Sequence, residues 1–165
     1  MKRPLAIAVL MLVVTCLAFG QQQTALPPKP SPEVLRLGSM IGTWKTDTGE
    51  KVTYEWFDGG FSVIGHVENS DKSTELRIIT YDPDTKTYSQ YRITSTGPGG
   101  TLARGGTISG NTWEYPVDDG ECGESAKCRF TIVEDTPTSF HAELEVSKGG
   151  GPWTVTFMTK GVKIK

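Results

Sequence analysis

The segment SPEVLRLGSMIGTW, residues 31–44, decides how the rest of the chain is interpreted. Ser31 is a favourable helix N-cap, and the proline and glutamate that follow it favour the first turn of a helix. Apolar residues then recur at helical spacing, and Gly38 or Gly42 can end the helix. The segment predicts one amphipathic helix, too short to be stable alone, that leads into a first strand containing Trp44.

From residue 42 onward, apolar residues recur at every second position, which is the period of a β-strand. Turn sequences rich in Gly, Asn, Asp and Pro separate these runs. The regular spacing, without a second helical segment, predicts an all-β fold of about ten antiparallel strands closed into a barrel, with a two-sheet sandwich as the alternative. The predicted strands span residues 42–48, 51–57, 61–68, 74–81, 87–95, 101–108, 112–117, 128–133, 140–147 and 153–164.

The N-terminus has the organisation of a signal peptide. Lys2 and Arg3 form a basic start, an apolar run follows, and small residues occupy positions 18 and 20. This pattern predicts a signal peptide over residues 1–20 and a protein that is exported, either periplasmic or secreted. The alternative is a lipoprotein anchored through Cys16, although the threonine before it matches a lipidation site poorly.

The remaining chain divides into a tether and one domain. Residues 21–31 are rich in Gln and Pro and predict a flexible, extended tether, whereas residues 32–165 predict a single barrel domain. The formal net charge of the full chain is −2, and no run of basic residues is present. We therefore expect no nucleic-acid partner and no membrane span in the mature chain. The pattern favours no particular oligomeric state.

Two cysteines, Cys122 and Cys128, follow the predicted signal peptide. An even pair in an exported chain predicts a structural disulfide. A redox pair is the alternative, but the spacing is not Cys-x-x-Cys. Two cysteines without nearby histidines are too few ligands for a zinc site, and no calcium loop is complete. We expect no metal and no cofactor.

The chain lacks the common hydrolase motifs Gly-x-Ser-x-Gly and His-Glu-x-x-His. Its two histidines, His66 and His141, lie on different predicted strands and share the polar side of each strand. Solvent-exposed histidines are expected, with a catalytic or haem-ligating role as the alternative. The sequence thus indicates a protein that is not an enzyme.

A barrel of this size can be filled by side chains or can hold one small ligand in its lumen. Arg104 shares the parity of apolar neighbours and is a candidate to face inward and meet an anionic head group. Gly42 and Trp44 are predicted to close the barrel at the helix end. The other candidates for a ligand-lining position are Val52, Tyr54, Trp56, Val63, Ile78, Tyr91, Phe130, Leu144 and Phe157.

Several motifs resemble a known family. Gly-Thr-Trp at residues 42–44, after a short helix, is similar to the Gly-x-Trp start of the lipocalin and calycin group. Together with EWFDGGF (55–61), YDP (81–83) and GGGPW (149–153), it resembles a bacterial family of exported lipocalin-like domains of unknown function. The resemblance covers about residues 31–165. It implies a calycin-like, that is lipocalin-like, β-barrel and no settled activity.

The chain departs from two related patterns. Lipocalins place an arginine late in the chain, packed over the Gly-x-Trp tryptophan, whereas the late cations here are Lys160, Lys163 and Lys165. Nitrobindins, which are ten-stranded haem barrels, open with Gly-x-Trp-x-Gly-x-Gly, and this chain lacks the two later glycines. His141 would be the candidate haem ligand, but it lies on the polar side of its strand.

The sequence therefore favours a binding module that holds a small hydrophobic or amphipathic ligand inside the barrel. The alternative is an envelope interaction or structural domain whose core is filled by side chains. A haem-binding or hydrolytic barrel is a further alternative.

Overall fold

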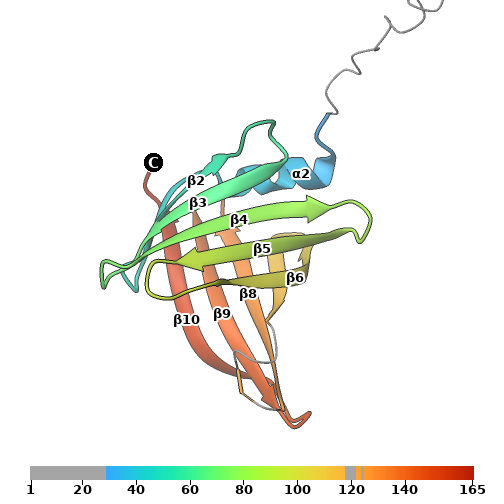
Figure 1. The fold of residues 1–165 in the computed structure, drawn as a ribbon. Helices are drawn as coiled ribbons and strands as arrows, with labels where there is room; N and C mark the ends of the chain where they lie inside the picture. The colour runs from blue at the N-terminus through green and yellow to red at the C-terminus, as the bar shows by residue number, and fades with distance from the viewer. Residues whose placement is uncertain (1–28, 118–121, 124) are drawn as a thin grey trace, which may run out of the picture.

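The computed structural model describes residues 29–117, 122–123 and 125–165 (Figure 1). The predicted signal peptide over residues 1–20, the alternative lipidation site Cys16 and most of the predicted tether lie outside the described residues.

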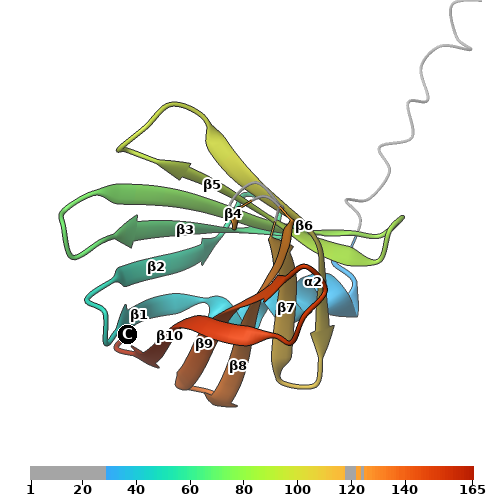
Figure 2. The same ribbon diagram turned by 90° about the horizontal axis from the view of Figure 1, so that it is seen from below.

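Ten antiparallel strands form a closed barrel in the order β1-β10-β9-β8-β7-β6-β5-β4-β3-β2 (Figures 1 and 2). Each strand pairs with the strands that precede and follow it in the sequence, and β1 pairs with β10 to complete the ring. The predicted all-β barrel with one short N-terminal helix is confirmed. The strands are β1 (Gly42–Thr46), β2 (Lys51–Trp56), β3 (Ser62–Glu68), β4 (Thr74–Asp82), β5 (Thr87–Thr94), β6 (Gly100–Ser109), β7 (Thr112–Val117), β8 (Ala126–Thr136), β9 (Ser139–Lys148) and β10 (Thr154–Lys163).

The helical segment consists of α2 (Pro32–Arg36) and the 3₁₀ helix η1 (Leu37–Met40). As predicted, Ser31 is the N-cap: its side-chain oxygen accepts a hydrogen bond from the backbone N–H of Val34 at 3.3 Å. The α-helix ends at Arg36, earlier than predicted, because the chain tightens into η1 before the first strand begins.

The segment lies across the end of the barrel where β1 begins (Figures 1 and 2). Three contacts hold it there. Leu37 is fully buried in the core, the Tyr88 hydroxyl donates to the Glu33 carbonyl at 3.0 Å, and the Trp44 indole N–H donates to the Met40 carbonyl at 2.7 Å. A helix of this length is not stable alone, so these contacts stabilise it.

Barrel closure depends on the start of β1 and the end of the chain. The Thr43 N–H donates to the Lys165 carbonyl at 2.8 Å, and the Ile164 N–H donates to the Thr43 carbonyl at 2.7 Å. Gly42 has φ +124°, and a Cβ there would lie 2.6 Å from the Lys165 carbonyl oxygen. Any larger residue at position 42 would therefore disturb the closure.

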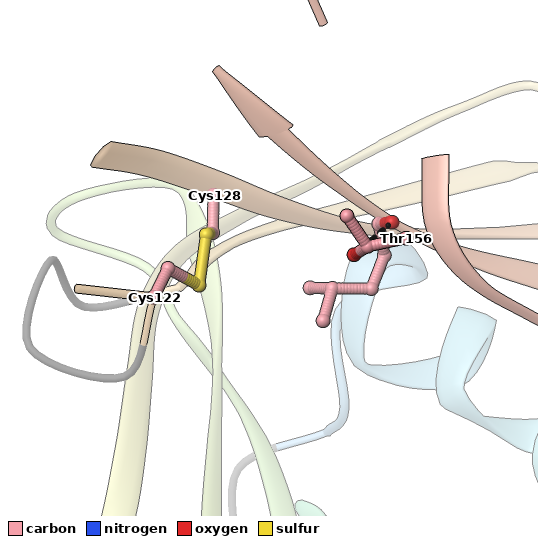
Figure 3. The surroundings of a disulfide bond; sticks show 4 residues. Cys122, Cys128 and Thr156 are labelled. Atoms are coloured by element: carbon pink, nitrogen blue, oxygen red, sulfur yellow. Dashed lines mark hydrogen bonds between the residues drawn. A yellow bond between two sulfur atoms is a disulfide. The ribbon is translucent and has the colours of Figure 1, made fainter. Parts of the chain in front are cut away.

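β8 is longer than predicted, and β10 contains an irregularity. β8 extends to Thr136, past the predicted end at residue 133, because Glu134 and Thr136 pair with Phe140 and Ser139 of β9. A register shift between Val155 and Phe157 marks an irregularity in β10. The Thr156 hydroxyl there donates to the Leu144 carbonyl at 3.1 Å (Figure 3).

The predicted disulfide is present. Cys122 is bonded to Cys128 near the start of β8, with the two Cα atoms 6.4 Å apart (Figure 3). Cys128 pairs with Val117 of β7 and Val146 of β9, so the bond ties Cys122 to the barrel wall.

Candidate functional site

The barrel encloses a cavity of about 680 Å³. This volume falls in the range of pockets that bury small-molecule ligands. At the helix end it is lined by η1 and Trp44, and it continues along the inner face of the strands. Its apolar and aromatic wall is formed by Met40, Trp44, Val52, Tyr54, Leu102, Ala103, Trp113, Tyr115, Val117, Phe130, Ile132, Phe140, Ala142, Leu144 and Phe157.

Two glycines make room for tyrosine rings on the inner face. A Cβ at Gly65 would lie 2.7 Å from Cδ1 of Tyr54, and a Cβ at Gly106 would lie 2.6 Å from Cδ1 of Tyr115. Each ring therefore lies over the bare backbone of a neighbouring strand. The two glycines thus help to keep the cavity open, because a side chain at Gly65 or Gly106 would push the tyrosine ring into the cavity.

The hydroxyl of Tyr115 is buried and has no hydrogen-bond partner among the described residues. The whole residue is 3 % exposed. Burial raises the pKa of Tyr115, and the nearby Tyr54 and Tyr88 contribute in the same direction. The group therefore stays protonated and can donate a hydrogen bond.

A charged cluster, the helix-end cluster of Arg36, Ser39, Trp113 and Glu134, lies where α2 crosses the barrel. Arg36 forms a two-pronged contact with Glu134 at 2.6 and 3.0 Å, and its guanidinium carbon lies 5.1 Å from the centre of the Trp113 ring. Ser39 and the Trp113 indole also donate to Glu134 at 2.7 and 3.0 Å. Burial would raise the pKa of Glu134, but these hydrogen bonds outweigh it and lower the pKa.

A second network, the far-end cluster of Glu50, Glu75, Arg77 and Arg92, lies at the opposite end. Arg77 contacts Glu75 and forms two contacts with Glu50 at 2.9 and 3.2 Å. Arg92 holds Glu75 from the other side at 2.9 and 3.2 Å. Burial would raise the pKa of Glu75, but the hydrogen bond from Arg92 and the charge of Arg77 lower it. Both clusters are thus internally neutral pairs of acids and bases.

The cavity opens to solvent at the end away from the helix. Arg92, Thr101 and Phe157 line it there; Arg92 is half-buried, whereas Thr101 is exposed and Phe157 is 43 % exposed. Cys122 also lines the cavity, so the disulfide borders this opening. The opening is thus bordered by an aromatic ring and by the paired charges of the far-end cluster.

The structure places the predicted lining residues in two groups. Val52, Tyr54, Phe130, Leu144 and Phe157 lie on the cavity wall. Val63 is fully buried in the packed core beside the cavity, and Trp56 lies near Gly38 at the helix end, 37 % exposed. Neither of these two is part of the cavity wall.

The inward positions predicted for Ile78, Tyr91 and Arg104 are not those of the structure. Ile78 and Tyr91 pair with each other, and their neighbours Arg77 and Gln90 line the cavity, so both point outward. In β6, Ala103 pairs with Gln90 and Gly106 pairs with Tyr88, which leaves an extra residue between them. This β-bulge breaks the alternation that placed Arg104 with Ile108, and Arg104 is exposed.

The polar residues on the cavity wall were not predicted from the sequence. Arg77, Arg92 and Glu50 were not among the predicted lining residues, because charged residues are seldom buried unless paired. The signal that could have placed them is the alternation of Glu75 and Arg77 with apolar residues, read with the opposite parity. Tyr115 was also not among the predicted lining residues, although it alternates with Trp113 and Val117 in one strand.

Neither histidine lies on the cavity wall. The His66 side chain is 63 % exposed beside Glu55, and Nδ1 of His141 lies 2.8 Å from an Asp135 carboxylate oxygen. Within the described ranges, His, Cys, Asp and Glu side chains form no group suited to a metal ion. The same residues include no helix long and apolar enough to cross a membrane.

Comparison with known proteins finds no family model that matches the chain and no match among curated proteins.

Proposed function

We propose that this protein is an exported, lipocalin-like barrel that binds a small hydrophobic or amphipathic ligand in its lumen. The observation that carries the proposal is the cavity of about 680 Å³. Its wall is mainly apolar and aromatic, with polar groups concentrated at two ends, which is the usual composition of a small-molecule site. The exposed Phe157 borders the opening at the far end, through which such a ligand would enter.

The contacts of Trp44 support the lipocalin-like character. Lipocalins stack a late arginine on the tryptophan of the Gly-x-Trp motif. Here the ammonium nitrogen of Lys163 lies 5.3 Å from the centre of the Trp44 ring. A lysine therefore makes the cation–π contact that an arginine makes in that group.

Ligand binding is testable with N-phenyl-1-naphthylamine, an uncharged probe that fluoresces in apolar surroundings. We expect the protein to bind it with saturation, and Ala103→Trp, which extends a ring into the cavity, to abolish binding. Thr107→Trp is the matched control, because Thr107 is exposed on the same strand. Circular dichroism would verify that both variants are folded. Equal binding by the two variants would refute a site in the lumen.

Export is supported by the basic and apolar pattern of residues 1–20. We expect the protein in the periplasmic or culture fraction of a bacterial host, with Gln21 as its N-terminus by mass spectrometry. A lipid on Cys16 would favour the lipoprotein alternative instead.

The second candidate is an interaction domain. Met158, Val162 and Ile164 are 50, 53 and 54 % exposed at β10 and the residue after it. Exposed apolar side chains of this kind are typical of interaction surfaces. Sedimentation at increasing concentration, compared between the native chain and Met158→Lys, would detect self-association through this face.

A further inference from the structure

We propose that the ligand is an uncharged, elongated molecule whose oxygen acceptor, such as a carbonyl, receives a hydrogen bond from the hydroxyl of Tyr115. This inference rests on the proposed function, because it assumes that the lumen binds a ligand. It adds the chemical class of that ligand and the residue that selects it.

The hydrogen bonding of the inward tyrosines distinguishes Tyr115. The Tyr54 hydroxyl lies 3.3 Å from the Arg77 guanidinium, which donates to it, and the Tyr88 hydroxyl donates to the Glu33 carbonyl. Tyr115 has no such partner in the part of the chain that the structure describes. Buried hydroxyls are seldom left unpaired, so this one is suited to a group that the chain itself does not supply.

The surroundings of Tyr115 define the shape of the ligand. Tyr115 lies in β7 between Trp113 and Val117, and all three line the cavity. Phe130 of β8 pairs with it and also lines the cavity. Apolar wall thus continues on both sides of Tyr115 along the strand. A molecule that fills this space carries apolar groups on both sides of a single acceptor.

The charges of the cavity argue against an anionic ligand. Each arginine of the helix-end and far-end clusters already contacts a carboxylate of the chain: Arg36 contacts Glu134, Arg77 contacts Glu50 and Glu75, and Arg92 contacts Glu75. A carboxylate on the ligand would have to compete with these glutamates for the arginines, and it would weaken the pairs that hold the partly buried carboxylates.

Lys163 is the group that could favour an anion instead. It lines the cavity at the helix end and lies over the Trp44 ring, and no carboxylate contacts it among the described residues. The experiment therefore includes this lysine. An anionic ligand would depend on Lys163, whereas an uncharged one would depend on Tyr115.

The test compares two competitors of equal chain length, methyl laurate and lauric acid, for displacement of N-phenyl-1-naphthylamine at pH 7.5. Methyl laurate offers an uncharged carbonyl and the acid is ionised. We expect methyl laurate to bind more tightly than laurate. Relative to its effect on the probe, Tyr115→Phe should weaken methyl laurate by about three- to tenfold, the value of one neutral hydrogen bond.

Two controls separate the hydroxyl from the fold. Tyr91→Phe removes the hydroxyl of a tyrosine that points outward, and should change neither affinity. Tyr115→Phe removes a buried hydroxyl without a partner, so its thermal stability without ligand should match or exceed that of the native chain. Methyl laurate should raise the melting temperature of the native chain more than that of the variant.

The outcomes distinguish this inference from the proposed function. If the probe does not bind at all, the proposed function fails and this inference fails with it. If the probe binds, but methyl laurate displaces it from Tyr115→Phe as well as from the native chain, the inference alone is wrong. Tighter binding of laurate that is lost in Lys163→Met would overturn it in favour of an anionic ligand.

Discussion

Trp44 connects three parts of the molecule through one side chain. It is 7 % exposed, its indole donates to Met40 in η1, and Lys163 of β10 packs on its ring. Its ring also meets Phe140 edge-on, with the centres 5.5 Å apart. The helical segment, the first strand and the last strand therefore share one anchor.

Replacing Trp44 with alanine is expected to reduce the free energy of unfolding by about 3–5 kcal/mol, the usual loss for a large buried aromatic side chain. Urea unfolding followed by circular dichroism would measure it. Trp56→Ala is the control, because Trp56 is 37 % exposed and should lose much less. Equal losses would show that Trp44 is not the structural anchor.

Arg77 and Arg104 provide a contrast between residues that sequence alone would treat alike. The Arg77 side chain is 15 % exposed and contacts Glu50 and Glu75, whereas Arg104 is exposed. Arg77→Met leaves Glu50 without its arginine and Glu75 with Arg92 alone, and it is expected to lower the free energy of unfolding by about 3–5 kcal/mol.

Arg104→Met is the matched substitution, and it should change the free energy of unfolding by less than about 0.5 kcal/mol. Urea titrations at pH 7 on both variants would measure the difference. A large loss in the Arg104 variant would contradict the outward position that the bulge gives this side chain.

The disulfide ties Cys122 to the barrel wall at Cys128 of β8. Removing it with Cys122→Ser and Cys128→Ser together is expected to lower the free energy of unfolding by about 2–3 kcal/mol, because the closed loop is short. Thermal melts of this variant and of the native chain, with and without reductant, would measure it. Reductant should lower the melting temperature of the native chain and leave that of the variant unchanged.

The strands show how far sequence patterns reach. Alternation placed Val52 and Tyr54 of β2 on the cavity wall because apolar residues face the core along that strand. In β4 and β5 the rule fails, since Arg77 and Arg92 face inward and their apolar neighbours face solvent. The inward arginines are stabilised because the far-end cluster pairs them with glutamates, mostly from outside their own strands. The sequence of a single strand does not reveal such contacts.

The bulge in β6 is a second limit. Gly105 has φ +74°, a conformation that favours glycine, yet glycine is common in turns as well as in bulges. A Gly-Gly pair at 105–106 within a predicted strand is therefore compatible with a turn or with a bulge. Alternation that ignores the bulge assigns Arg104 to the wrong face of the strand. The number of strands and the helix were predictable because turns and N-caps are local; the inner wall required the pairing register.

The two charged clusters line opposite ends of one cavity. The pKa of Glu75 in the far-end cluster and that of Glu134 in the helix-end cluster are both lowered from an ordinary value of 4.5. In each case arginine contacts outweigh the effect of burial. The unfolded chain therefore binds protons at these sites more readily than the folded chain does.

Stability should consequently depend on pH in one direction. Well above pH 4.5 both carboxylates are ionised in either state, and the stabilisation is complete. As the pH falls below this value, the unfolded chain takes up protons first, and stability is lost as the pH passes through the lowered pKa values of the folded state. Urea unfolding at pH 7, 4.5 and 3 is expected to give a free energy that is nearly level between the first two and falls sharply at the third.

Glu75→Gln provides the control for this dependence. The variant should be less stable at pH 7, because Arg77 and Arg92 lose the carboxylate they share. Its free energy of unfolding should also fall less between pH 4.5 and 3 than that of the native chain, since one of the shifted groups is gone. Glu143→Gln, a change on the outward face of β9, should leave the slope nearly unaltered. If both variants fall as steeply as the native chain, the acid sensitivity does not arise from the far-end cluster.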